Sequence, residues 1–177
     1  MALIGEFGWG APMAAVVVER LIVMGVQAVV SIGTAGSLQR SLTIGPTVVR
    51  DRTLRDEGVS HHYLTPGQFA HADATLTPRL WAELETSSIG TSWTIDTPFR
   101  ETVEEARYYQ SEGVLCVEME AAALMAVAQH RQIPFATAFS ISDSLGELVW
   151  DPQFRAPETA EGLRCFYRAA VAVLDRP

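Results

Sequence analysis

The chain has 177 residues and a formal net charge of −8, and all 13 of its Lys and Arg positions are arginine. A chain of this length buries roughly 70% of its unfolded surface, so it needs no disulfide or metal to hold it together. The negative charge argues against nucleic acid or an anionic membrane as the main partner. The lack of lysine excludes Schiff-base chemistry and a Walker-type phosphate loop.

Other simple signals are missing as well. The sequence has no CxxC pair or Cys/His ligand spacing, so we expect no metal site. It has no charged leader with an apolar run behind it and no apolar run of about 18 residues. We therefore expect a cytoplasmic protein without a membrane span.

The first part of the chain predicts a glycine loop, a helix, a strand and a turn. Residues 5–12 read GEFGWGAP, and their proline suits the first turn of a helix over residues 13–24. Residues 27–32 are apolar and β-branched, as in a buried strand. Residues 33–36 then predict a tight glycine turn. Its backbone N–H groups and the Thr34 hydroxyl could bind an anion, or the segment could be a plain connection.

The rest of the chain alternates between strand and helix patterns. Strands are predicted at 47–51, 90–96, 114–117 and 134–142, and helices at 77–85 (with Thr77 as N-cap), 101–110, 118–130 and 158–175. A polar loop is predicted at 55–67, and a second loop, which contains Trp150 and two prolines, is predicted at 145–157. This alternation predicts a layered α/β fold with a sheet that is at least partly parallel.

Two glutamates flank Met119 where an apolar strand gives way to a helix. Carboxyl ends of strands are where open α/β sheets bind ligands. The carboxylates of Glu118 and Glu120 could each accept two hydroxyl hydrogen bonds, as a ribose diol offers. The alternative is that both only favour the positive end of the helix.

A third acidic side chain, Asp143, ends the most apolar strand directly after Ser142. Burial favours a protonated carboxyl, which could serve as a general acid near neutral pH. The alternative is a cap for a following turn. Earlier in the chain, a proline breaks a strand beside Phe99. Its ring could stack on a base or could belong to the core.

In this order, several segments resemble the purine nucleoside phosphorylase / uridine phosphorylase family. The matching segments are GWGAP (8–12), IGTAGSL (32–38), IG (44–45), DEGVS (56–60), DTPF (96–99), VEMEAAA (117–123) and SISD (140–143). The most specific feature is VEMEAAAL followed by a strand that ends in Ser-Asp. The resemblance covers nearly all of the chain.

The resemblance implies a three-layer α/β sandwich with a mixed, mostly parallel central sheet flanked by helices, as a single domain over residues 1–177. It implies a homo-oligomer, a dimer or a trimer of dimers. The implied activity is phosphorolysis of a nucleoside to free base and ribose 1-phosphate, with inorganic phosphate as co-substrate and no cofactor. The short run between Asp96 and Glu118 favours a purine over uracil, as in purine salvage.

The resemblance also assigns residues to the parts of a nucleoside site. Those assigned to the ribose are Glu118, Met119 and Glu120; those assigned to phosphate are Gly33 and Thr34; those assigned to the base are Phe99 and Ser142; and Asp143 is assigned to protonation of the purine N7.

Two departures from the family pattern concern phosphate. Ser31 stands where the family phosphorylases usually carry an arginine, which holds phosphate bidentately. The chain also begins within the first half of the family fold, so we expect the opening strand with its phosphate-binding glycine and arginine to be missing. Two alternatives therefore stay open. One is a phosphate-independent nucleosidase, with Glu6 as a nearby carboxylate, and the other is a nucleoside-binding member without turnover.

Overall fold

The computed structural model describes residues 1–45, 47–84 and 87–175. Its helices within these residues are α1 (Ala11–Val23), α2 (Leu76–Ala82), α3 (Val103–Ser111), α4 (Ala121–Arg131) and α5 (Pro157–Leu174), with short 3-10 turns η1 (Ser60–His62) and η2 (Pro98–Arg100). Its strands are β1 (Val29–Ser37), β2 (Thr47–Asp56), β3 (Phe69–His71), β4 (Ser87–Ile95), β5 (Cys116–Glu118), β6 (Phe135–Ser144) and β7 (Asp151–Pro152).

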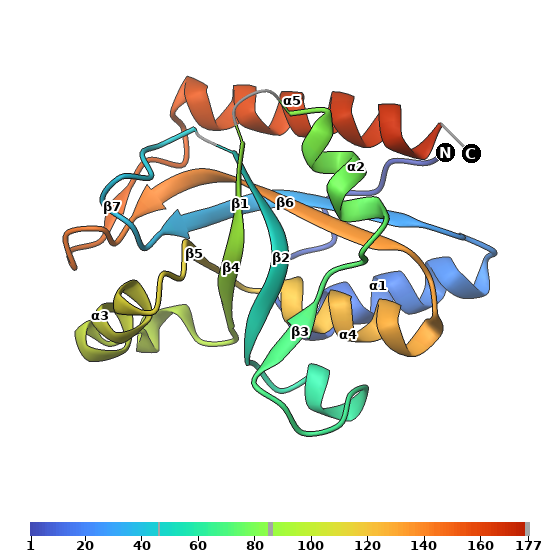
Figure 1. Ribbon diagram of the computed structural model, residues 1–177, viewed down its shortest axis with the longest axis horizontal. Coiled ribbons are helices and arrows are strands. Elements are labelled where there is room, and N and C mark those ends of the chain that lie inside the picture. The colour runs from blue at the N-terminus through green and yellow to red at the C-terminus, as the bar shows by residue number, and fades with distance from the viewer. Residues whose placement is uncertain (46, 85–86, 176–177) are drawn as a thin grey trace.

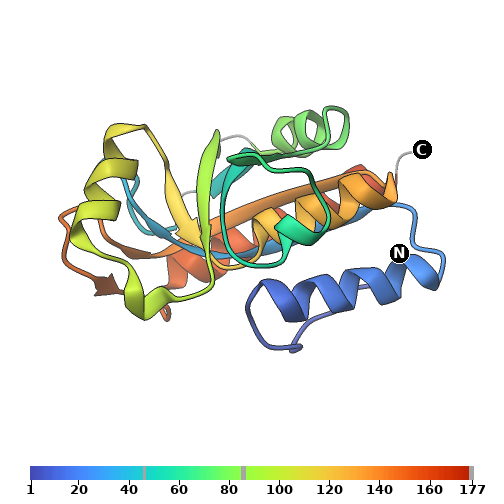
Figure 2. The same cartoon turned by 90° about the horizontal axis from the view of Figure 1, so that it is seen from below.

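The strands form one mixed sheet between two helical layers. Their order is β3-β2-β4-β5-β1-β6-β7, and β2 also pairs with β6, so part of the sheet closes on itself. The longest ladders, β1 with β6 and β2 with β4, are parallel. Helices α1 and α4 cover one face, while α2 and α5 cover the other (Figures 1 and 2). This arrangement confirms the predicted α/β class.

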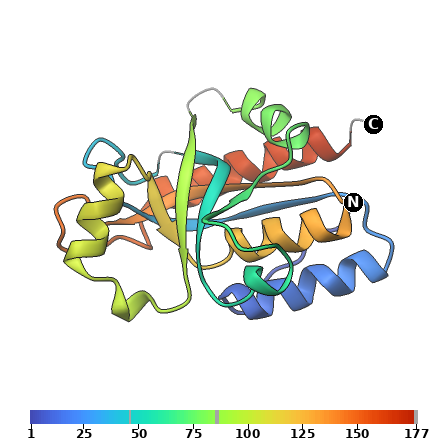
Figure 3. The same ribbon diagram turned by 60° about the horizontal axis from the view of Figure 1, so that its bottom comes forward.

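Helix α4 is the most deeply buried helix segment of the structure. Every residue from Ala121 to Ala128 is at most 4% exposed. Because five of these side chains are only methyl groups, the helix can lie close to both the sheet and α1 (Figure 3). Close packing of α4 fixes its first turn, which carries the glutamates singled out above.

The glycine turn predicted at residues 33–36 is wrong. Strand β1 runs through this segment to Ser37 and pairs with β6, with a register shift between Ala35 and Gly36. The glycines serve close packing: a Cβ at Gly33 would lie 3.2 Å from the Phe139 ring, and one at Gly36 would lie 2.8 Å from an Asp143 oxygen. Sequence alone could not separate this use of glycine from a turn.

Two helix starts also differ from the prediction. Thr77 lies inside α2 rather than at its N-cap, and the carboxylate of Asp73 accepts hydrogen bonds from the backbone N–H groups of Thr75 and Leu76. The predicted end of this helix at Glu85 lies outside the described residues. Helix α3 begins at Val103 rather than at residue 101, because a capping box between Thr102 and Glu105 fixes its start.

No helix in the described ranges is long and apolar enough to span a membrane.

We expect Gly162→Ala to destabilise the fold, although alanine is the better helix former. A Cβ at Gly162 in α5 would lie 2.2 Å from Ser140 Oγ and 2.9 Å from the Gly45 carbonyl oxygen. Overpacking of this kind costs about 1–3 kcal/mol. Urea unfolding should show a lower midpoint for this variant. The control Gly5→Ala, which meets no atom within 4 Å, should keep the wild-type midpoint. Equal midpoints for both variants would contradict the packing shown here.

Candidate functional site

Glu118 ends β5 inside a ring of hydrogen-bond donors. Its Oε2 accepts hydrogen bonds from the backbone N–H groups of Glu120 (2.8 Å) and Ala121 (2.7 Å). Its Oε1 lies within hydrogen-bonding distance of hydroxyls from β2 and β4: Thr53 at 3.4 Å, Ser92 at 3.2 Å and Thr94 at 2.5 Å. The side chain is 5% exposed. Glu118 thus caps the start of α4 and ties this helix to the two strands.

Glu120 is held differently from Glu118. The backbone N–H of Gly10, at the start of α1, donates a 2.5 Å hydrogen bond to Glu120 Oε1. Gly10 has a φ of 96°, which favours glycine. Burial, together with the nearby charge of Glu118, raises the pKa of the Glu120 carboxyl, although the hydrogen bond from Gly10 acts in the opposite direction. A partly buried carboxylate of this kind gains from further hydrogen-bond donors.

Asp143 lies at the end of β6 and is oriented by two side chains. Ser142 Oγ donates to Asp143 Oδ1 at 2.8 Å, and the indole N–H of Trp150 donates to Oδ2 at 2.9 Å. Gly36 provides the space on β1, since a Cβ there would meet Asp143 Oδ2. Trp150 itself is 55% exposed and packs at 6.1 Å from the Phe154 ring. Asp143 is therefore fixed in orientation at the edge of an open aromatic surface.

One row of paired residues joins the Glu118 and Asp143 groups. Asp143 on β6 is paired with Gly36 on β1, and Gly36 is paired with Val117 on β5, directly before Glu118. Two strand spacings amount to about 10 Å. Because β5 runs antiparallel to β1, the ends of β5 and β6 approach from opposite directions. Asp143 and Val117, the residue before Glu118, thus lie in one row of the sheet, two strands apart.

Glu101 is a further acidic residue, which the sequence predicts as the first residue of a helix and which lies before the start of α3. It lies partly buried between η2 and α3. Burial, followed by the charges of Asp143 and Glu105, raises the pKa of the Glu101 carboxyl to about 7. In the sequence, only the position of Glu101 could have pointed to it, two residues after Phe99 and directly before the Thr102 capping box.

The residues predicted for phosphate are Gly33 and Thr34, which lie in β1 opposite Phe139 and Ser140 of β6. Thr34 is exposed, and its hydroxyl has no hydrogen bond to another residue in the described part of the chain. Ser31 lies further back on the same strand and is partly buried. The phosphate assignment of Gly33 and Thr34 therefore stays a prediction.

The remaining predicted residues differ in exposure. Phe99 in η2 is 95% exposed, so its ring is not part of the core. Ser142 is 1% exposed, and its hydroxyl is directed to Asp143. Met119 is partly buried between the two glutamates. The assignments of Phe99 and Ser142 to a base and of Met119 to a sugar stay predictions.

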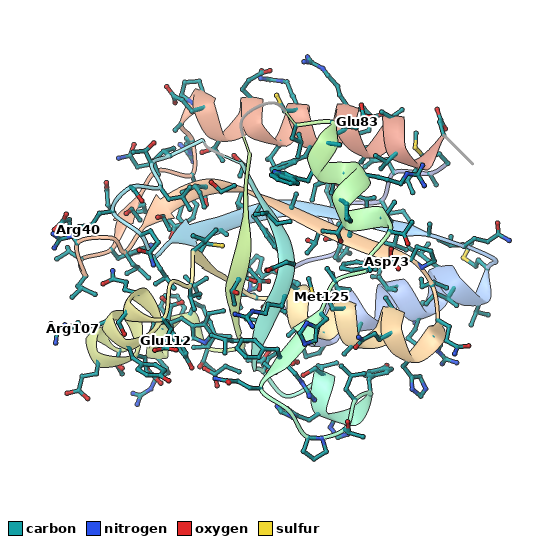
Figure 4. All side chains as sticks on the ribbon, viewed as in Figure 1. Arg40, Asp73, Glu83, Arg107, Glu112 and Met125 are labelled. Atoms are coloured by element: carbon teal, nitrogen blue, oxygen red, sulfur yellow. The ribbon has the colours of Figure 1, made fainter. Side chains whose placement is uncertain are left out.

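A separate cavity of about 420 Å³ lies between α4, the start of β6 and the segment after β3. It is lined by residues that include Asp73 and Met125, whereas Arg107 of α3 and Glu112, directly after this helix, lie away from it on the left of the view (Figure 4). None of the predicted site residues lines it. Across the described ranges, no three His, Cys, Asp or Glu side chains gather as ligands for a metal ion.

Comparisons with known proteins point to one family. A family model described as the phosphorylase superfamily matches residues 1–171. A guanosine phosphorylase from Halorubrum lacusprofundi is 28% identical over 142 residues, which cover 78% of this chain and 59% of the relative. A DeoD-type purine nucleoside phosphorylase from Caldanaerobacter subterraneus subsp. tengcongensis is 29% identical over 145 residues, 78% of this chain and 62% of the relative.

A uridine phosphorylase from Salmonella typhimurium is 29% identical over 140 residues, 67% of this chain and 54% of the relative. The chain thus matches less than two thirds of the length of each of these relatives. Among solved structures, a uridine phosphorylase from Vibrio fischeri, complexed with 6-hydroxy-1-naphthoic acid, superimposes with a TM-score of 0.80. The superposition covers 97% of this chain and 72% of that structure, at 24% identity.

Glu118→Gln should lower the stability of the protein, whereas Glu120→Gln should not. A carboxamide at 118 turns an N–H₂ group toward the N–H donors of Glu120 and Ala121, so we expect a loss of about 1–3 kcal/mol. A carboxamide oxygen at 120 can still accept from Gly10. Because the pKa of Glu120 is raised in the folded state, its ionised form costs stability as pH rises above the unfolded-state value. Glu120→Gln should therefore be neutral or stabilising at pH 7.

Urea unfolding of both variants at pH 7 measures this difference. A Glu118→Gln variant as stable as wild type, or a Glu120→Gln variant less stable than Glu118→Gln, would contradict the structural role given to Glu118.

Proposed function

Since the chain belongs to the phosphorylase superfamily, we propose that it is a nucleoside phosphorylase that acts preferentially on purine nucleosides. It would cleave the N-glycosidic bond with inorganic phosphate as co-substrate, giving free base and ribose 1-phosphate, with no other cofactor. The observation that carries this proposal is the row of paired residues Asp143, Gly36 and Val117, which places the oriented Asp143 carboxyl two strands away from the segment that holds Glu118 and Glu120.

The sugar would lie against Met119 and Glu120. Glu118 uses both of its oxygens within the protein, so its part is to orient the first turn of α4 rather than to bind substrate. Glu120 keeps one carboxylate oxygen, Oε1, on Gly10 and offers its remaining lone pairs to the ribose hydroxyls. A charge-assisted hydrogen bond of this kind is about twice as strong as a neutral one.

The base would lie between Asp143 and the exposed aromatic rings. Asp143 would donate a proton to N7 of the purine, so that the electrons of the breaking C1′–N9 bond pass to a neutral leaving group. Protonation by a positioned carboxyl contributes typically 10²–10⁴-fold in rate. Phe99, which is 95% exposed, is available for stacking on the ring.

Phosphate would attack C1′ of the ribosyl cation from the side of Gly33 and Thr34. Ser31 supplies no charge there, and this observation favours a second candidate, hydrolysis by water. The two candidates share the sugar and base residues and differ only in the nucleophile. They predict opposite responses to added phosphate.

Self-association is part of the proposal. Apolar side chains of the N-terminal segment and α1 are exposed: Phe7 at 38%, Trp9 at 80%, Met13 at 47% and Val16 at 47%. A second copy of the chain could cover this surface.

Base release from inosine, guanosine, adenosine and uridine, with and without phosphate, tests the function. We expect release from the purine nucleosides that rises with phosphate. Asp143→Asn should lower the rate by about 10²–10⁴, whereas Asp51→Asn, at an exposed position of β2, should not change it.

If the rate of base release from purine nucleosides does not change when phosphate is added, the reaction is hydrolysis and not phosphorolysis. Binding of a nucleoside, seen as a thermal shift, without release of base would contradict both candidates.

A further inference from the structure

Trp150 is an aromatic residue beside Asp143 to which the mechanism above assigns no task of its own. It lies in the β6–β7 hairpin, which comprises residues 143–152 and in which Asp143 pairs with Pro152. Its indole N–H donates a hydrogen bond to Asp143 Oδ2 at 2.9 Å. Strand pairing and this hydrogen bond together set the position of the indole ring.

The hairpin is anchored to the rest of the fold. The backbone N–H of Leu145 donates to the carbonyl oxygen of Ser37 at 2.8 Å, and Gln110 Nε2 donates to the carbonyl oxygen of Leu145 at 3.2 Å. The side chains of Leu145 and Leu148 are partly buried and pack against a buried apolar cluster. These contacts tie the hairpin to β1 and α3.

Other apolar side chains of this hairpin and of the residues after it face solvent. Val149 is 72% exposed, Trp150 is 55% exposed and Phe154 is 57% exposed, and the rings of Trp150 and Phe154 lie 6.1 Å apart. Neighbouring exposed aromatic rings on an anchored segment favour the binding of a flat, apolar group. Asp143 lies at the edge of this apolar surface.

Asp143 connects this apolar surface to the proposed base site. Its Oδ1 accepts a hydrogen bond from Ser142 Oγ at 2.8 Å, and its Oδ2 accepts the one from Trp150. A carboxyl group has about four sites for hydrogen bonds, so roughly two remain for a ligand. A ligand atom bonded to either oxygen lies within two hydrogen-bond lengths and one carboxyl width of the indole nitrogen, roughly 8 Å at most.

We propose that Trp150 determines the specificity of the base site, because its indole contacts the base that Asp143 binds. The two fused rings of a purine overlap an indole more fully than the single ring of a pyrimidine does, so this contact favours purines. The position of the base at Asp143 rests on the proposed function, and Trp150 is a further residue that selects the base.

The indole N–H of Trp150 reports this contact without any reaction. Its ¹H–¹⁵N resonance, identified as the one absent from Trp150→Phe, can be followed by NMR while hypoxanthine, the base of inosine, is added. The resonance should shift until it reaches saturation, and uracil should need about tenfold more ligand for the same shift. The resonance of Trp81, identified with Trp81→Phe, should not move, since α2 and β7 lie well apart (Figure 1).

Substitution separates the ring of Trp150 from its N–H group. Trp150→Leu removes both, so hypoxanthine should bind about tenfold more weakly, whereas Trp150→Phe keeps a ring and should lose about threefold at most. The matched control Trp81→Leu should bind hypoxanthine as the wild type does. Isothermal titration calorimetry measures these affinities, and thermal unfolding checks that each variant is folded. If Trp150→Leu does not fold, the NMR titration of the wild type decides.

Base release measures the specificity itself. The ratio of kcat/KM for inosine to kcat/KM for uridine should fall at least about fivefold in Trp150→Leu and stay unchanged in Trp81→Leu.

Three results would overturn the proposal, even in an active phosphorylase. They are a Trp150 resonance that hypoxanthine does not move, a Trp150→Leu variant with wild-type affinity and ratio, and equal losses of affinity in Trp150→Phe and Trp150→Leu. Equal losses would mean that Trp150 acts only through its hydrogen bond to Asp143. A Trp150 resonance that responds to hypoxanthine in a protein that releases no base would instead reject the proposed function and leave the base contact in place.

Discussion

The hydrogen bonds to Glu118 are the constraint on which the rest of this site depends. A carboxylate that is 5% exposed would be costly without partners, so β2, β4 and the first turn of α4 must all supply donors to it. These donors fix where α4 begins and hence where Glu120 lies. Glu118 and Glu120 therefore have different roles. Glu118 joins α4 to the neighbouring strands, and Glu120 is the residue that we propose to face the sugar.

The closure of the sheet explains how donors from β2 and β4 reach one residue of β5. Because β2 pairs with both β4 and β6, the sheet closes on itself at β2, and hydroxyls of β2 and β4 lie within hydrogen-bonding distance of Glu118 Oε1. The end of β6 lies two strands away from the end of β5, because β1 pairs with both. The proposed sugar site, which follows β5, and the proposed base site, at the end of β6, therefore lie on strands that run in opposite directions.

The sequence predicted this layered fold because its apolar strands and helices alternate clearly, and it located the acidic residues because they follow those strands. It failed at Gly33–Gly36, where the strand continues because Phe139 and Asp143 need the space that glycine leaves. It also missed Glu101, whose environment comes from β6 and α3, remote in sequence from one another. Partners of this kind leave no local pattern, so only the folded chain reveals them.

The central claim is that Glu120 and Asp143 bind the two ends of one nucleoside. A crystal structure of the protein with a purine nucleoside tests it most directly. The account predicts ribose hydroxyls within hydrogen-bonding distance of Glu120, N7 of the base at Asp143, and Glu118 still bonded to the start of α4. A nucleoside found elsewhere, such as in the cavity beside Asp73 and Met125, or one that leaves Glu120 and Asp143 untouched, would contradict it.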